Sequence, residues 1–364
     1  MIKTFTSSLA LTLLLLLSLG RYQTQAMTAS PFPVQVTQPD GTVVTLRIKG
    51  DETLNWFEDE AGFTVIVDLG QYVYANLDAG GWLASTGLRA GSVNPQAAGL
   101  LAGIFPSAQK VSAYRASHSL LAAPAEVQAQ AVATAAEAPA AVSAVGTVKN
   151  LVVLCKFSDH DDTKTRSRED YDVIFNTVGG DPTLAPTGSV RDYFTETSYG
   201  TVTLQSTVVA WVTLPHTEAY YTNGTSGLSS PYPNNGQGMA ADALPLVDAL
   251  VDFGQFDANN DGYVDAIDFI HSGYAAETGG GAGNWMWSHK WSLWAVPGGR
   301  WTSADNNGNG VKVKVYDYHT EAALWGTSGT GITRIGVVCH ETGHFFGLPD
   351  LYDTDGSSEG IGSY

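Results

Sequence analysis

The sequence HETGHFFGLPD occupies residues 340–350 and decides the fold of the second half of the chain. Its pattern predicts a helix over residues 332–346, which places His340 and His344 one turn apart on the same face. Two imidazoles in this arrangement can bind one zinc ion. Glu341, beside the first histidine, can take a proton from a water molecule at that ion. The stretch therefore predicts a zinc centre carried by a helix.

The residues after this helix supply a third candidate ligand. Gly347 lets the chain leave the helix in a tight turn, and Pro349 stiffens the exit. Asp350 comes three residues after the glycine, where the extended metalloprotease pattern has its third ligand. An aspartate oxygen is an accepted zinc ligand, although an aspartate here can also serve as a turn or cap residue. We expect His340, His344 and Asp350 to bind the zinc.

The sequence around this motif predicts a domain over residues 149–364 with both strands and helices. Residues 151–157 form a nearly continuous apolar run, as in a buried strand. Alternation of strands with helices favours an α/β or α+β domain with a mixed, twisted sheet and the zinc helix beside it. The further elements that we expect are strands over 201–214, 266–271 and 311–318 and helices over 190–198 and 239–253, with Pro245 as a kink.

The first half of the chain predicts a small β-rich module. Short alternating runs separated by glycine turns occupy residues 27–110, with the Asp40-Gly41 pair as a hairpin signal. Residues 111–148 are rich in alanine, valine, serine and glutamine, which is typical of a linker that proteases can reach. The module contains no cluster of metal ligands, so we expect no chemistry of its own.

Composition and the first residues indicate a secreted protein. The net charge of −18 argues against nucleic acid or anionic membrane as a partner. Residues 1–26 resemble a signal peptide, with Lys3 before an apolar run of 11 residues over 9–19 and small residues before a cleavage point after Ala26. No later stretch is long and apolar enough for a membrane span. Whether Cys155 and Cys339 form a disulfide stays open.

A second motif, DANNDGYVDAID, has the spacing of an EF-hand-like calcium loop over residues 257–268. Gly262 stands at the sixth place, where such a loop turns sharply. The alternative is a polar turn between a helix and a strand. We expect a structural calcium site, and the candidate ligands are Asp257, Asn259, Asp261, the carbonyl of Tyr263, Asp265 and Asp268.

The motif HETGHFFGLPDLYD at 340–353 resembles the signature of immune inhibitor A-type metallopeptidases. The segments SVRDYF at 189–194 and SYG at 198–200 are similar to a part of the same family, and QPDG at 38–41 and GDE at 50–52 resemble its pro-segment. The resemblance implies a secreted zinc endopeptidase with a zincin catalytic domain and an N-terminal propeptide. Its substrates would be proteins or peptides, and the propeptide would act as its inhibitor.

Two features qualify this resemblance. The expected propeptide has no cysteine, which excludes inhibition by a cysteine bound to the zinc. A methionine turn, which metzincins carry after the third ligand, is missing, because the four methionines all precede the motif. Only 14 residues follow Asp350, so we expect this catalytic domain to be incomplete and to belong to a longer protein.

Two other functions are compatible with the motifs. The same zinc chemistry can hydrolyse amides other than peptides. Alternatively, the chain can be a calcium-dependent binding protein whose zinc site is inactive. The retained Glu341 argues against the second alternative, because a decayed site has no reason to keep a general base between two intact ligands.

Overall fold

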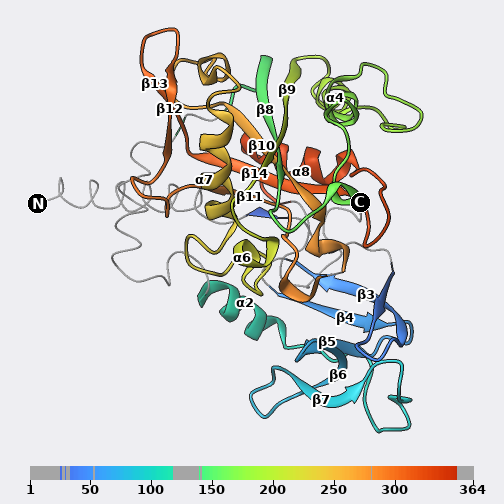
Figure 1. Cartoon of the computed structure of the whole chain (residues 1–364). Coiled ribbons are helices and arrows are strands. Elements are labelled where there is room, and N and C mark those ends of the chain that lie inside the picture. Colours follow the sequence, from blue (N-terminus) through green and yellow to red (C-terminus); the bar gives the residue numbers. More distant parts are fainter. Residues whose placement is uncertain are drawn as a thin grey trace, which may run out of the picture.

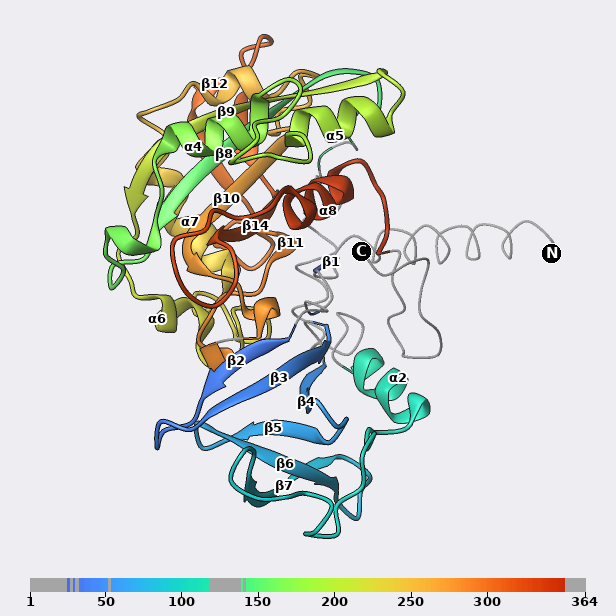
Figure 2. The ribbon, with the colours of Figure 1, turned by 90° about the vertical axis from the view of Figure 1, so that its right-hand side faces the viewer.

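The computed structural model describes residues 25–26, 29, 33–51, 54–117, 139, 142–279 and 281–350. Two sheets form the two parts of the molecule, a smaller β-rich module and a larger domain that carries the HETGH helix (Figures 1 and 2). The predicted signal peptide, except residues 25–26, and most of the predicted linker lie outside the described residues.

The smaller module is a sheet of six antiparallel strands in sequential order, as expected for a meander. Alternating side chains such as Val44, Leu46 and Ile48 are buried, while those between them face outward. The strands are β2 (Val34–Thr37), β3 (Val43–Gly50), β4 (Asn55–Asp59), β5 (Thr64–Asp68), β6 (Gln71–Leu77) and β7 (Leu83–Arg89), followed by the helix α2 (Ala108–Ser117).

The larger domain has a mixed sheet in the order β1-β11-β14-β10-β8-β9 among the described residues. Strands β9, β8, β10 and β14 run parallel to one another. Next to β14, strand β11 pairs antiparallel with β14, and β1 pairs antiparallel with β11. These strands are β1 (Gln25–Ala26), β8 (Gly146–Lys156), β9 (Val202–Thr213), β10 (Ala266–Tyr274), β11 (His289–Ser292) and β14 (Asp317–Leu324). The prediction of a mixed α/β architecture is confirmed at this level.

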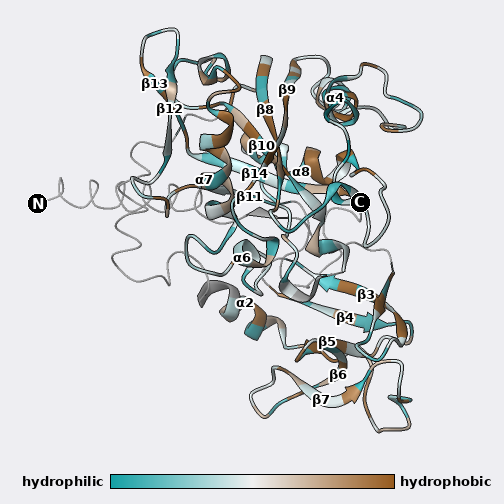
Figure 3. Ribbon diagram, viewed as in Figure 1, coloured by the Kyte–Doolittle hydropathy of each residue, from teal (hydrophilic) through white to brown (hydrophobic). Residues whose placement is uncertain are grey.

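Helices cover both faces of this sheet. The helix α7 (Gly236–Val247) packs on one face, against residues such as Leu151 and Phe269. The helices α4 (Arg168–Asn176), α5 (Val190–Thr197) and α8 (Ile335–Phe345) pack on the other face, against residues such as Val152 and Ile270. Figure 3 shows hydrophobic residues gathered on α7 and the strands that it covers. The strands have apolar residues on both faces because both faces are covered.

The remaining elements are short. They are the helix α6 (Glu218–Thr222), the hairpin of β12 (Trp301–Asn306) and β13 (Lys312–Val315), and the 3-10 turns η2 (Asp162–Lys164), η3 (Phe253–Phe256), η4 (Ala276–Thr278) and η5 (Gly281–Gly283). No helix within the described ranges has the length and hydropathy that a membrane span needs.

Three of the predicted elements have different bounds. The helix predicted over 239–253 begins at Gly236 and ends at Val247, so Pro245 lies in its last turn rather than at a kink. The strand predicted over 311–318 is two strands, β13 and β14, which belong to different sheets. The zinc helix begins at Ile335 instead of residue 332. Local sequence does not reveal these ends, because partners distant in sequence decide them.

The two parts of the molecule share one hydrophobic cluster. Leu228, Ala276 and Trp287 of the larger domain are buried together with Val36, Leu46 and other residues of strands β2 to β6. The module therefore packs on the larger domain through side chains that both parts contribute. Cys155 and Cys339, by contrast, are both buried inside the larger domain as free thiols, so the disulfide alternative is not realised.

Candidate metal centre

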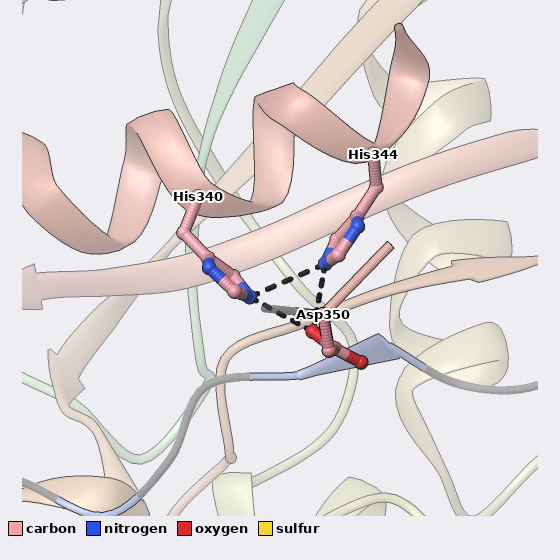
Figure 4. A group of neighbouring side chains, drawn as sticks. All are labelled: His340, His344 and Asp350. Carbon is pink, nitrogen blue, oxygen red and sulfur yellow. Dashed lines mark hydrogen bonds and ion pairs between the residues drawn. The ribbon is translucent and has the colours of Figure 1, made fainter. Parts of the chain in front are cut away.

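The helix α8 lies against the sheet through one side and carries the predicted ligands at its C-terminal end. Val338, Thr342 and Phe345, spaced by four and three residues, are buried toward the sheet. This spacing is that of one helical face, so the sheet fixes the side that α8 buries. His340 and His344 are also one turn apart, and Figure 4 shows their rings projecting from α8 toward the same point.

A tight turn after α8 brings Asp350 back to the two histidines. Gly347 has φ +81°, a left-handed conformation in which glycine avoids the strain of a side chain. The amide of Gly347 donates to the carbonyl of His344 at 3.0 Å, which closes the end of the helix. The chain then reverses, so that Asp350 faces the rings of His340 and His344 (Figure 4).

Three donor atoms meet at this point. His340 Nε2 lies 3.1 Å from Asp350 Oδ1 and 3.2 Å from His344 Nε2, and His344 Nε2 lies 3.3 Å from Asp350 Oδ1. Tetrahedral zinc with bonds of 2.0–2.1 Å separates its ligand atoms by about 3.3 Å. The three separations therefore fit the edges of one face of a zinc tetrahedron.

The protonation of His344 also suits a metal ligand. Its Nδ1 lies 2.7 Å from the carbonyl oxygen of Leu348, which can only accept a hydrogen bond. The proton is therefore on Nδ1, and the lone pair of Nε2 points toward the other two ligands. A backbone carbonyl that fixes the ring of a ligand histidine in this way is usual for zinc sites.

Electrostatics hold Asp350 in the charged form that binds metals. Burial raises the pKa of its carboxyl group, but the neighbouring side chains of His340 and His344 outweigh burial, and the pKa is lower than usual. The His344 side chain is only 1% exposed, whereas His340 and Asp350 are 23% and 18% exposed. Solvent and a substrate can therefore reach the three ligand atoms from the side of His340 and Asp350.

Glu341 lies on α8, between His340 and His344 in the sequence. Its side chain is fully buried, and its Oε2 is 3.8 Å from His344 Nε2. A carboxylate at this distance from a metal ligand can exchange a proton with a water molecule at the metal. The four residues that the sequence singled out for catalysis and zinc binding thus lie together.

The predicted calcium loop is only partly assembled. Asp257 accepts hydrogen bonds from the amides of Asp261 and Gly262 and from the side chain of Asn307. Asn259 accepts from the amide of Asp261. These bonds hold a compact polar turn between η3 and β10.

Asp265 lies at the edge of this loop. Its Oδ2 accepts from the amide of Ala258 at 3.0 Å. Burial raises the pKa of Asp265 most, the hydrogen bond from Ala258 lowers it, and the charges of Asp257 and Asp261 raise it further. The resulting pKa is about 6. Tyr263 is 6% exposed, and its amide donates to the side chain of Asp261. Three carboxylates therefore repel one another here.

Asp268 is the exception among the predicted calcium ligands. It lies in the middle of β10 and is fully buried, and its Oδ1 is 3.5 Å from His319 Nδ1 on the neighbouring strand β14. The structure therefore places Asp268 beside His319 and Glu321. The twelfth place of the motif falls inside a parallel strand, whose pairing decides where the side chain points.

Two residues near α8 were not identified from the sequence. His319 and Glu321 lie on β14 and are fully buried on the sheet face that α8 covers, together with Asp268. The alternation Tyr318-His319-Thr320-Glu321 was a usable signal, because polar residues at i and i+2 of a strand share one face. The sequence did not show that this face is buried.

Comparisons with known proteins agree with this geometry. Residues 140–364 match the family described as immune inhibitor A peptidase M6, catalytic domain. Immune inhibitor A of Bacillus thuringiensis subsp. alesti is 31% identical over 246 residues, which cover 58% of this chain and 34% of that protein. The pre-pro-metalloprotease PrtV of Vibrio cholerae serotype O1 is 24% identical over 191 residues, 47% of this chain and 20% of PrtV.

The chain thus spans about a third of the length of immune inhibitor A and a fifth of that of PrtV. The family match covers more than half of the chain, includes the HETGH helix and its turn, and ends with the last residue. The chain belongs to the immune inhibitor A family of peptidases, and residues 140–364 correspond to its catalytic domain.

Proposed function

We propose that this chain is part of a secreted, zinc-dependent endopeptidase that is made as a zymogen. The observation that carries the proposal is the set of three ligand atoms, 3.1–3.3 Å apart, next to the buried carboxylate of Glu341. Three protein ligands with one position left for water or substrate are typical of catalytic zinc and not of structural zinc. The family membership favours peptide bonds over other amides as the substrate.

In this proposal His340, His344 and Asp350 hold the zinc. Bound zinc supplies a Lewis acid that polarises the substrate carbonyl and makes a nearby water acidic. Asp350 contributes a negative charge, which the two neutral imidazoles do not. Its lowered pKa keeps that charge available near neutral pH.

Glu341 acts as the general base. Its carboxylate takes a proton from the attacking water and returns it to the nitrogen of the leaving amine. This carboxylate is buried beside His344, which keeps it out of bulk water. A general base of this kind contributes about 10²–10⁴-fold to the rate.

The β-rich module over residues 27–110 is proposed to be the propeptide, in front of a zincin domain over 149–364. The shared cluster around Trp287 supports a stable contact between the two, as an intramolecular inhibitor requires. The segment 111–148, with its many small residues, is the proposed activation region. The Vibrio relative is named a pre-pro-metalloprotease, which supports a secreted precursor.

The main experiment compares two substitutions in the full-length, activated protein, with casein as substrate. Glu341→Ala is expected to lower cleavage about 10²–10⁴-fold and to keep zinc, because it removes the base and no ligand. Asp350→Ala is expected to lower the affinity for zinc by more than about a hundredfold and to lose activity with the zinc. Zinc is measured by elemental analysis, and a zinc chelator should abolish wild-type cleavage. Persistent cleavage by Glu341→Ala contradicts the mechanism.

A structural calcium ion at the loop over residues 257–265 remains a proposal. The raised pKa of Asp265 supports it, because carboxylates that repel one another gain most from a bound cation. Calcium at a hundred times its Kd should stabilise the folded protein by about 2.7 kcal/mol. Removing the calcium with EGTA should therefore lower the melting temperature by several degrees.

The matched variant for this loop is Asp265→Asn, which keeps an acceptor for the amide of Ala258 but removes the charge. We expect its melting temperature to respond much less to calcium. An EGTA-insensitive wild-type protein would show that the loop is only a polar turn.

A further inference from the structure

A buried polar cluster lies between the sheet and the zinc helix. Asp268 on β10 pairs with His319 on β14 in the parallel register, and Glu321 follows on the same face of β14. All three side chains have no exposed surface. They face α8 from the side opposite to α7, among apolar residues such as Ile270 and Val338.

Hydrogen bonds within this cluster hold the ring of His319. Its Nδ1 lies 2.7 Å from Glu321 Oε1, a hydrogen-bond distance, and 3.5 Å from Asp268 Oδ1. Burial lowers the pKa of His319 to about 4, so the ring is neutral near pH 7. Burial also raises the pKa values of Asp268 and Glu321, so the contact at Nδ1 joins His319 to its neighbours through a proton, and Nε2 faces α8.

The Nε2 side of His319 contacts α8. Thr342 Oγ1 lies 3.4 Å from His319 Nε2, and both groups are fully buried. The His319 ring also packs edge-on against Phe345, with ring centres 5.3 Å apart. His319 therefore contacts α8 at two residues that flank His344, and one of them directly follows Glu341 in the sequence.

Apolar contacts also hold α8 on the sheet. Its N-cap residue, Arg334, makes no capping hydrogen bond through its side chain. Val338, Cys339 and Phe345 contribute apolar contacts, which are non-directional and tolerate small rotations. A hydrogen bond is directional, and catalytic groups need alignment within about 10–20°.

We propose that Glu321, His319 and Thr342 form a positioning relay that sets the rotation of α8 and so aligns Glu341 and His344. His319 is the central positioning residue, Glu321 holds the orientation of its ring through Nδ1, and Asp268 supports both from β10. This inference rests on the proposed peptidase function, and it adds residues that contact neither zinc nor substrate.

A second metal ion is the competing explanation, since the same three side chains have types that bind metals. The distance of 2.7 Å between His319 Nδ1 and Glu321 Oε1 favours a shared proton, because metal ligands of 2.0–2.1 Å bond length are about 3.3 Å apart in a tetrahedron. The candidate zinc centre, with 3.1–3.3 Å, fits that spacing. The relay therefore predicts one zinc per chain.

The experiment removes one buried hydroxyl group at a time, that of Thr342 on α8 or that of Thr320 on β14. Thr342→Val removes the group that contacts His319 and keeps the shape of the side chain. Thr320→Val is the matched control, because Thr320 is equally buried on β14 and its hydroxyl donates to the carbonyl of Phe269 instead. Thr342→Ser restores a hydroxyl at the helix.

For Thr342→Val we expect kcat to fall about ten- to a hundredfold with little change in KM, because misplaced catalytic groups slow the reaction step. The visible spectrum of the cobalt-substituted protein should change, since His344 shifts with the helix. Thr342→Ser should recover most of kcat and the spectrum. Thr320→Val should lose stability to a similar extent and keep both wild-type values.

Three results would overturn the relay. Equal losses of kcat in Thr342→Val and Thr320→Val would mean a general stability effect. An unchanged cobalt spectrum and kcat in Thr342→Val would mean that the hydroxyl does not position α8. Two zinc ions in the wild type, with one in Glu321→Gln, would mean that the cluster is a metal site.

The proposed function fails in a different way. A wild-type protein that binds one metal at α8 without cleaving casein would contradict the peptidase function only, because the cobalt spectrum still tests the relay. The two proposals can therefore be separated in one set of proteins.

Discussion

His344 combines a candidate metal-binding atom with the hydrogen bond that prepares it. Its Nδ1 is held by the carbonyl of Leu348, and its Nε2 faces His340 and Asp350. The turn at Gly347 supplies this carbonyl and also carries Asp350. A few residues after the helix thus provide both a ligand and the orientation of another ligand.

Burial keeps the side chain of His271 neutral in the folded protein. His271 is fully buried in β10, and burial lowers its pKa to about 3. The unfolded chain takes up a proton on this residue below its usual pKa of 6.5, whereas the folded chain does not. His271 therefore costs stability as the pH falls below about 6.5, and it costs nothing near pH 8.

We predict that His271→Asn weakens this acid sensitivity. Between pH 7 and pH 5 the wild-type free energy of unfolding should fall by about 2 kcal/mol more than that of the variant. Urea unfolding at the two pH values measures the difference. Parallel pH profiles would show that His271 is protonated in the folded protein.

At the scale of elements, Gly336 and Gly347 stand at opposite ends of α8 and have opposite roles. Gly336 lies in the first turn and Gly347 after the last turn, and a Cβ atom on either would meet no heavy atom within 4 Å. Only Gly347 has a positive φ, +81°. Steric contacts therefore play no part, and backbone conformation alone distinguishes the two sites.

We predict that Gly347→Ala lowers stability by about 1–2 kcal/mol, the usual cost of a left-handed conformation for alanine. It should also weaken zinc binding, because Asp350 reaches the metal position through this turn. Gly336→Ala should raise stability by up to about 1 kcal/mol, as alanine favours helices. Melting temperatures and zinc titrations test this pair, and a stabilising Gly347→Ala would contradict it.

At the scale of the whole molecule, the module and the larger domain are joined through the cluster that contains Trp287. This side chain is 2% exposed and belongs to the larger domain, but its hydrophobic neighbours include residues of the module. Loss of a buried tryptophan costs about 3–5 kcal/mol. Trp287 should therefore dominate the contact between the two parts.

We predict that the module stays bound after limited proteolysis within residues 118–138. The two fragments of the wild type should elute together in gel filtration, and those of Trp287→Ala should separate. Trp301→Ala is the control, because Trp301 packs against Phe253 inside the larger domain. Separation of the wild-type fragments would disprove a stable contact.

The sequence by itself determined the HETGH helix, its turn and the grouping of His340, Glu341, His344 and Asp350. These features depend on spacing within one helix and one turn, and such short-range geometry follows from the order of residues. The same holds for the antiparallel meander, whose strands pair with their neighbours in the chain. The family resemblance came from the same short motifs.

Only the tertiary structure decided the position of Asp268, which the motif had assigned to calcium and which lies instead beside His319. The two residues are 51 positions apart, and the pairing of β10 with β14 brings them together. It also decided that Thr342 faces His319. Contacts of this kind depend on strand order and on which face a helix covers, and these are set by the packing of the whole domain.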